Sequence, residues 1–422
     1  MRAEITRHAL DRVPLSIIFD DSTVLVNLNY FMMRDYNIEA PGNPALNAGQ
    51  DHRWQDVPVV HPESFTREFA EFCLEKGVRG KFSVVPCPAG LGRIDEYLPL
   101  FSRTQQDSWL EMCRELIVPA FDITPEMLTH THVLDLDTFQ PRPERIWEQY
   151  EWRQLPADDE EGVVQYIAKS CEILVNVGLT PQGVTSPGGF GRGSLDLYAR
   201  CAGQAVRQVT GNPLPYFFQG VETEGRVDSR VWYADPQSGT AVGEVIAGAH
   251  DWTGNWTGYG EAEADLYITA DLQGGRLPQL IAAGDPAIMV SHWQGFYGLH
   301  DDDRRGFKAF QTVVDRLRQL DPRGERTQWR RCSEISTYAC AREMAQIEVA
   351  DNQVTLDLPV MPPELTLRLH IPTVDAVRID GQPLRRVGSR AHLQAGAFLQ
   401  TDNAVLVAFD PQQSHVKIEV ER

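Results

Sequence analysis

Short apolar runs alternate with longer segments of helical periodicity over the first 340 or so residues. The runs are Leu15–Phe19, Lys81–Pro86, Val242–Ala249 and Ala287–Trp293. Nearly continuous apolar runs of this length are typical of parallel strands whose two faces are both covered by helices. The pattern therefore predicts an α/β fold in which each buried strand is followed by a helix.

The segments between the runs carry apolar residues at spacings of three and four. In the segment that begins at Ser64, Phe65, Phe69 and Phe72 fall on one helical face, and Gly77 marks its end. The same spacing predicts helices over 105–117, 163–177 and 194–209. About six or seven strand-helix units result, and this number favours an irregular (β/α) barrel.

The pattern changes after about residue 342. From Ile347 onward, apolar and polar residues alternate with a period of two in short runs that are separated by turns. This pattern predicts a small antiparallel β domain, arranged as a sandwich or sheet. We therefore expect two domains, a (β/α) barrel catalytic domain at 1–342 and a β-sandwich-like accessory domain at 343–422.

A long polar and aromatic segment, from about Thr23 to Val60, follows the first apolar run directly. Connections of this length in compact domains are usually functional or disordered. We expect this segment to form a loop or lid over a site at the end of the first strand.

Composition narrows the function classes. The 422-residue chain is 42% hydrophobic and 23% charged, with a formal net charge of −20, which disfavours nucleic acid and anionic membranes as partners. The N-terminus lacks an apolar signal core, and the seven scattered cysteines resemble core thiols of a reducing compartment. We expect a cytoplasmic protein, with a homo-oligomer possible through the C-terminal β domain.

Two adjacent carboxylates, Asp20 and Asp21, follow the first apolar run directly. The carboxyl ends of parallel strands carry the ligand site in α/β folds. Adjacent acids repel each other unless a cation or a proton offsets their charge, so the pair indicates a metal or proton site. The alternative interpretation is an Asp-Asp turn that caps the next segment.

The pair His130 and His132 is the second candidate metal motif. In an extended chain, residues two positions apart point to the same side, so both imidazoles could bind one ion. Together with a carboxylate they would form a hydrolytic site for zinc or a similar divalent metal. A histidine pair of this spacing is also common in protein cores and on surfaces, and this alternative stays open.

The order of these motifs resembles the polysaccharide deacetylase (NodB-homology) family, which belongs to the glycoside hydrolase/deacetylase (β/α) barrels. The resemblance covers about residues 12–340, and its motifs are Phe19-Asp20-Asp21, Gly80–Pro86, His130-Thr131-His132, Thr180-Pro181 with Ser186–Gly189, and Met289–His292. The chain departs from the family at Ser22, where glycine is usual, at Leu134, where a second ligand histidine is usual, and before Pro187, where arginine is usual. It therefore resembles a divergent member.

The resemblance implies a role for each matched residue. Asp21, His130 and His132 would bind the metal, Asp20 would be the base that activates water, and His292 would protonate the leaving group. Independently of the family, a carboxylate beside a bound cation stays ionised at neutral pH, and a histidine can serve as an acid. The alternatives are a structural role for Asp20 and a buried, backbone-bonded His292.

Aromatic and glycine-rich loops surround these motifs. Flat rings beside polar groups suit stacking on sugars, although they also suit loop packing or subunit contacts. The candidate substrate-binding residues are Pro187, Gly188, Trp252, Trp256, Trp293 and Tyr297.

The sequence thus predicts a hydrolase that depends on a divalent metal, either zinc or one of cobalt, nickel and manganese. Its expected substrate is an N- or O-acetylated sugar or oligosaccharide, or another small acetylated compound. Two alternatives are another C–N amide hydrolase or glycosidase-like relative, and an inactive carbohydrate-binding or assembly protein.

Overall fold

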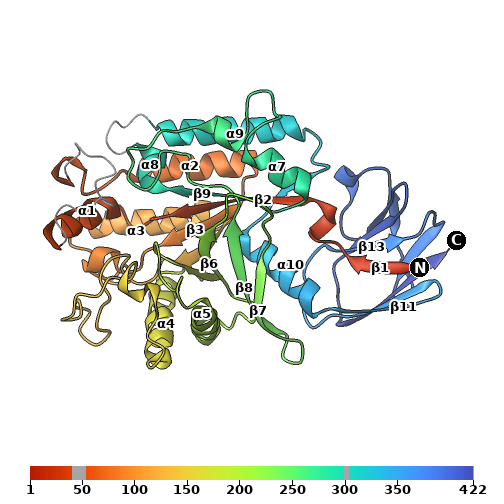
Figure 1. Cartoon of the computed structure of the whole chain (residues 1–422), viewed down its shortest axis with the longest axis horizontal. Coiled ribbons are helices and arrows are strands. Elements are labelled where there is room, and N and C mark those ends of the chain that lie inside the picture. Colours follow the sequence, from red (N-terminus) through yellow and green to blue (C-terminus); the bar gives the residue numbers. More distant parts are fainter. Residues whose placement is uncertain (40–53, 299–303, 422) are drawn as a thin grey trace.

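The protein has a mixed α/β fold. A computed structural model describes residues 1–39, 54–298 and 304–421. Helices cover both sides of the central strands, with α2 and α9 on one side and α4 and α5 on the other (Figure 1). Among the described residues, no helix combines the length and apolarity needed to cross a bilayer.

The first parallel sheet has β2 at its centre. β2 pairs in parallel with β3, β9 and β10, and β3 pairs in parallel with β4. A Cβ added to Gly80 would lie 1.9 Å from the Ile17 carbonyl oxygen, so the close approach of β3 to β2 requires glycine there. The bounds are β2 (Val13–Asp20), β3 (Gly80–Val84), β4 (Phe121–Pro125), β9 (Ala287–His292) and β10 (Thr327–Trp329).

A second sheet continues the parallel arrangement and ends in an antiparallel edge strand. β6 pairs in parallel with β5 and β8, and β7 pairs antiparallel with β8. Two parallel bridges, one from β4 to Pro181 just before β5 and one from Glu126 just after β4 to β5, link these two strands. The Gly248 and Ala249 amides donate to the Ile288 carbonyl of β9. The bounds are β5 (Gly183–Thr185), β6 (Tyr216–Val221), β7 (Arg230–Asp235) and β8 (Thr240–Ala247).

Helices lie where the spacing of apolar residues predicted them. Gly77 ends α2 with a φ of 70°, a left-handed conformation that glycine adopts at little cost. The helix predicted over 105–117 ends in a π-helical turn at Cys113–Ile117. The bounds are α1 (Leu28–Glu39), α2 (Glu63–Lys76), α3 (Arg103–Met112), α4 (Glu160–Asn176), α5 (Leu195–Thr210), α6 (Ala264–Tyr267), α7 (Arg276–Ala283), α8 (Trp293–Tyr297), α9 (Arg305–Leu320) and α10 (Cys332–Met344).

The segment expected to form a lid is partly helical. Its start contains α1, which the sequence analysis did not predict, and a short 3₁₀ turn covers Trp54–Asp56. Residues 40–53 of the expected lid lie outside the described residues. Met32 of α1 lines a pocket together with Asp20 and Asp21, so this segment does reach the end of the first strand.

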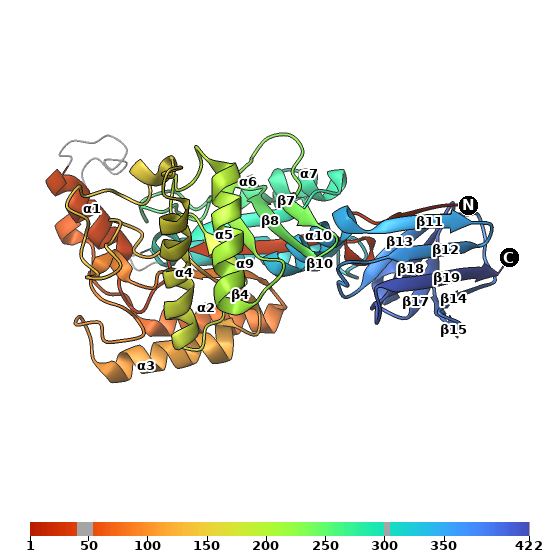
Figure 2. The ribbon, with the colours of Figure 1, turned by 90° about the horizontal axis from the view of Figure 1, so that it is seen from below.

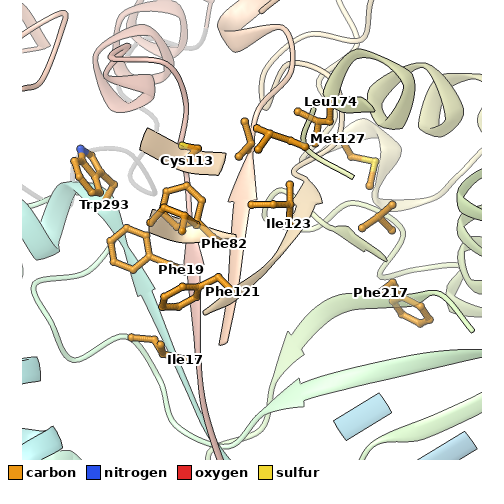
Figure 3. Close-up of a cluster of buried hydrophobic side chains, with 14 of the residues drawn as sticks. Ile17, Phe19, Phe82, Cys113, Phe121, Ile123, Met127, Leu174, Phe217 and Trp293 are labelled. Atoms are coloured by element: carbon orange, nitrogen blue, oxygen red, sulfur yellow. The ribbon is translucent and has the colours of Figure 1, made fainter. Parts of the chain in front are cut away.

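The core around β2 is rich in aromatic side chains. Phe19 stacks on Phe69 and Phe82, with ring centroids 4.7 and 5.7 Å apart, and Trp293 meets it edge-on. Figure 3 shows Phe19, Phe82 and Phe121 clustered beside the central strands. All seven cysteines are buried and unpaired, as the sequence pattern predicted for core thiols.

The C-terminal residues, together with β1, form two five-stranded sheets that share one apolar core, which includes Leu356, Leu367 and Ile418. β1, which the sequence analysis assigned to the first domain, pairs antiparallel with β13 of this β unit. Both chain termini consequently lie on it (Figures 1 and 2). The bounds are β1 (Arg2–Ile5), β11 (Gln346–Ala350), β12 (Gln353–Asp357), β13 (Leu365–His370), β14 (Ala376–Ile379), β15 (Gln382–Pro383), β16 (Arg385–Val387), β17 (Ala397–Gln400), β18 (Val405–Phe409) and β19 (His415–Glu421).

Candidate functional site

A pocket of about 490 Å³ lies at the carboxyl ends of the parallel strands. Asp20 ends β2, Glu126 follows β4, and His292 ends β9, so the strand ends bring together residues from distant parts of the sequence. The titratable residues that line the pocket are Asp20, Asp21, Glu126, His130, Tyr150, Arg192, His250, Asp251 and His292. Of the catalytic and metal-binding residues predicted from the sequence, only His132 does not line it.

Asp20 is buried beside an ammonium group. The Lys81 side chain is fully buried, and its Nζ donates hydrogen bonds to Asp20 Oδ1 and to Thr185 Oγ1. Burial raises the pKa of Asp20 to about 6, although the charge of Lys81 opposes this shift. The carboxyl group is therefore mostly ionised at neutral pH and can accept a proton.

Asp21 adopts a φ of 62°, which turns the chain out of β2. Its Oδ2 accepts a hydrogen bond of 2.9 Å from Gln294 Nε2, and its Oδ1 is buried 2.8 Å from His130 Nε2. Although burial alone would raise the pKa of Asp21, the nearby His130 lowers it. Asp21 therefore stays ionised, and its Oδ1 faces His130.

Glu126 and His130 complete a three-residue cluster with Asp21. His130 Nε2 lies 2.8 Å from Asp21 Oδ1 and 3.2 Å from Glu126 Oε1. Burial lowers the pKa of His130, but the two carboxylates outweigh burial and raise it well above its ordinary value. Because two carboxylates meet at one imidazole, the cluster favours a bound proton or metal ion.

The three residues fit a divalent metal. One atom of each lies within 4.8 Å of the others, and all three side chains are buried. Glu126 Oε2 accepts from the Asp21 amide at 2.8 Å and from Ser83 Oγ at 2.5 Å, which leaves Oε1 facing His130. Two carboxylate oxygens and one imidazole nitrogen form a donor set that zinc and manganese both accept.

His132 lies outside this cluster, contrary to the ligand set expected from the sequence. Its Nε2 lies 2.9 Å from Arg145 Nη2, and its ring packs against Trp147. The physical reason is the backbone at His130, whose φ of 65° breaks the extended conformation that the spacing argument assumed. Glu126 takes the place expected for His132 beside Asp21.

A buried carboxylate holds the turn that presents His130. Glu148 Oε1 accepts hydrogen bonds from the Leu128 and Thr129 amides and from Tyr166, and Oε2 accepts one of 2.8 Å from the His130 amide. The Gln149 side-chain amide lies 2.9 Å from His130 Nδ1 and fixes the ring from the other side. Glu148 thus accepts hydrogen bonds from three successive backbone amides, 128–130, which lie outside any strand or helix.

His292 is paired with the carboxylate of Asp251, and both residues line the pocket. Its Nδ1 lies 2.7 Å from Asp251 Oδ2, and Asp251 Oδ1 accepts from the Thr253 amide and hydroxyl. Burial lowers the pKa of His292, but the hydrogen bond with Asp251 and the charge of Asp21 raise it to about 10. His292 is therefore protonated at neutral pH and can donate a proton into the pocket.

The predicted substrate-binding residues separate into two groups. Gly188 and Trp256 line the pocket, and Trp256 is half-buried there. Pro187 and Trp252 do not line it. Trp293 and Tyr297 lie in the core, 2% and 7% exposed, because α8 turns them against Phe65.

Three site residues were not identified from the sequence: Lys81, Glu126 and Glu148. Lys81 begins an otherwise apolar run, and a charge in a buried strand was a usable signal. Glu126 directly follows β4, a strand that the hydrophobic pattern did not predict. Glu148 lies among other charged residues in the sequence, and nothing local marks it as buried.

Comparisons with known proteins leave the family open. No protein-family model matches the chain, and no curated protein sequence matches it. Among solved structures, an α-amylase from Anoxybacillus is 8% identical, with a TM-score of 0.36 and coverage of 98% of this chain and 99% of the other. An α-L-fucosidase is 10% identical, with a TM-score of 0.31 and coverage of 99% and 97%. A family 30 subfamily 8 xylanase from Clostridium acetobutylicum is 8% identical, with a TM-score of 0.32 and coverage of 99% and 98%. At these scores, the site has to be interpreted from its own geometry.

Proposed function

We propose that this chain is a hydrolase that depends on a divalent metal and removes an N- or O-acetyl group from a sugar or oligosaccharide. The observation that carries the proposal is the convergence of three elements on one pocket. These are the Asp21–Glu126–His130 cluster, an ionised Asp20, and a protonated His292. The motif order, which resembles that of polysaccharide deacetylases, supports the same chemistry.

We interpret the parallel strands as an irregular (β/α) barrel. Parallel pairing or bridges connect β9, β2, β3, β4, β5, β6 and β8 in turn, and hydrogen bonds to Ile288 return from the end of β8 to β9. In such barrels the catalytic residues lie at the carboxyl ends of the strands. The pocket lies at these ends, which supports the interpretation.

Asp21, Glu126 and His130 would hold the metal ion. A bound divalent ion polarises a carbonyl oxygen and lowers the pKa of water at the site. The chain supplies the other components. Gln294 orients Asp21, Ser83 orients Glu126, and Gln149 orients His130. Such supporting contacts fix the ligand geometry and tune the basicity of the ligands.

Asp20 and His292 would divide the proton transfers. Asp20, with a pKa of about 6, takes a proton from the attacking water, and Lys81 holds the carboxylate in place. His292, with a pKa of about 10, donates a proton to the leaving nitrogen or oxygen. Environments that push two pKa values apart in this way define a base and an acid in one site.

The walls of the pocket suit a sugar ring. Trp256 is half-buried, Tyr150 is 46% exposed, and both line the cavity. Flat aromatic faces beside polar groups give both apolar contact and room for hydroxyl hydrogen bonds.

Acetate release from N-acetylated and O-acetylated oligosaccharides tests the proposal. We expect turnover by protein loaded with zinc, cobalt, nickel or manganese, loss of turnover with a chelator, and recovery when metal is restored. Asp20→Asn and His292→Ala should each lower kcat by about 100-fold or more. As a control, Arg323→Gln changes a side chain that is 76% exposed and should leave kcat unchanged.

Two results would contradict the proposal. Undiminished turnover by metal-free protein would remove the metal from the mechanism. Tight oligosaccharide binding with no acetate release under any metal would instead favour a carbohydrate-binding or assembly protein.

A further inference from the structure

A β-bulge places an extra residue beside the pocket. The pairing of β6 with β8 shifts register between Phe218 and Gly220, so Gln219 has no partner residue on β8. In a regular strand, neighbouring side chains point to opposite faces, whereas a bulge re-aims the extra residue. Phe218 and Gln219 accordingly both line the same pocket.

The amide of Gln219 lacks a hydrogen-bond partner. The residue is 8% exposed, and its Nε2 is buried with no acceptor among the described residues. A buried donor that pairs with nothing is costly, and such groups in native proteins call for an explanation. Because this donor lines a cavity, a ligand oxygen is the partner that would satisfy it.

A second unpaired donor lies on the neighbouring strand end. Arg192 lies in the loop after β5, is exposed, and lines the same pocket. Its guanidinium makes no ion pair or hydrogen bond with any described residue. The Ser186 amide donates a bond of 2.9 Å to the Phe218 carbonyl, so the loop that carries Arg192 begins beside the bulge.

We propose that Gln219 and Arg192 bind an anionic oxygen group of the substrate, such as a carboxylate or a phosphate. Both side chains offer N–H donors, and a guanidinium matches the planar geometry of such oxyanions. This inference depends on the proposed function in one respect, namely that the acetyl group of the substrate lies beside Asp20 and Asp21. Asp20, Asp21 and Glu126 repel an anionic group, so this group would bind beside Gln219 and Arg192.

Calorimetric titration of the full chain in metal-free buffer, at physiological salt, tests this inference without turnover. The phosphate arm compares N-acetylglucosamine 6-phosphate with N-acetylglucosamine, and the carboxylate arm compares glucuronate with glucose. We expect at least one anionic ligand to bind about tenfold more tightly than its neutral counterpart, the size of one charge-assisted contact. The arm that shows the preference identifies the anion.

The variants then localise the effect. Arg192→Gln should abolish the preference for the anion, and Gln219→Leu should reduce it, while the surface control Arg323→Gln should keep it. The inference would be overturned if, in both pairs, the anionic and the neutral sugar bound equally or not detectably. An unchanged preference for the anionic sugar in Arg192→Gln would also overturn it. An anion preference without acetate release would overturn the proposed function alone, and acetate release without a preference would overturn this inference alone.

Discussion

The Lys81 ammonium donates a hydrogen bond to the Asp20 carboxylate at the end of β2, where both side chains are buried. Lys81 also donates to Thr185 Oγ1 at 2.7 Å and lies 5.2 Å from the centre of the Phe218 ring. Removing one member of such a pair leaves an uncompensated buried charge. The base proposed for catalysis thus depends on a residue from the next strand.

Replacing Lys81 should therefore affect both stability and activity. We expect Lys81→Met to lower the free energy of unfolding by about 3–5 kcal/mol. Since the charge of Lys81 lowers the pKa of Asp20, its loss should also move the acid limb of the kcat/KM profile to higher pH. Urea denaturation and a pH profile measure the two effects. Lys81→Met combined with Asp20→Asn should be more stable than Lys81→Met alone, and equal stability would contradict the coupling.

The pair formed by His292 and Asp251 should set the alkaline limb of the kcat/KM profile against pH. The pKa of His292 is raised from 6.5 to about 10, so its acid form persists through neutral pH. The pair's contribution to fold stability is fully present below pH 6.5 and is lost as pH rises through about 10. Asp251→Asn should lower the pKa of His292 and move the alkaline limb of kcat/KM down by about 1–3 pH units.

NMR titration of the His292 imidazole checks this shift directly. Asp265→Asn is a matched control because that carboxylate is 70% exposed and does not line the pocket. An alkaline limb at the same pH in Asp251→Asn and in the wild type would show that another group provides the proton.

The hydrophobic pattern predicted the elements whose composition follows the usual rules. β2 and β9 are apolar runs buried on both faces, and α2 has one apolar face and a terminal glycine. The carboxylates Asp20 and Asp21 could be placed at a ligand site because they end such a run abruptly.

β4 was missed because polar residues are buried inside it. Asp122 is 1% exposed, and its carboxylate accepts hydrogen bonds from the Ser333 amide and hydroxyl at 2.6 and 2.7 Å. A hydrogen-bond partner 211 residues away thus makes Asp122 suitable for the core, and no local pattern in the sequence reveals this partner. Without β4, Glu126 could not be placed at a strand end.

The metal ligands show the limit of spacing arguments. The expectation for His130 and His132 assumed an extended backbone, but Glu148 binds the amides of this turn and stabilises a positive φ at His130. Two residues that would share a face in a strand then point apart. Likewise, β1 was assigned to the first domain because only its long-range pairing with β13 shows where it belongs.

Glu148 should be needed for the turn that carries His130. In Glu148→Gln, an NH₂ group replaces one of the two carboxylate oxygens. This NH₂ group would face a backbone N–H of the turn, and two donors cannot form a hydrogen bond with each other. We expect metal affinity to fall by about 10- to 100-fold. Tyr166→Phe removes one hydrogen bond to Glu148 but keeps its carboxyl group, and should cost only about 1 kcal/mol. Zinc titration and thermal denaturation compare the variants, and unchanged zinc affinity in Glu148→Gln would contradict the role.

The N-terminal strand should stabilise the C-terminal β unit. Ile5 of β1 is 9% exposed and belongs to the core of that unit. We expect Ile5→Ala to lower the free energy of unfolding of the β unit by about 2–4 kcal/mol. Hydrogen exchange should show faster amide exchange in β13 and β18, while β2 and β3 stay protected. Ala3→Ser, on the same strand but only partly buried, is the control. Uniform loss of protection across the chain would instead indicate one cooperative unit.

The structure and the sequence suggest different third ligands for the metal: Glu126 in the structure and His132 in the expectation from sequence. We expect Glu126→Gln to bind zinc at least about tenfold more weakly, because an ionised carboxylate beside Asp21 and His130 is lost. His132→Ala should bind zinc like the wild type, because His132 contacts Arg145 and Trp147 instead. Equilibrium dialysis with elemental analysis measures both variants without relying on activity. The reverse result, retained zinc in Glu126→Gln and lost zinc in His132→Ala, would mean that metal binding rearranges the 126–132 turn into the ligand set that the family resemblance implied.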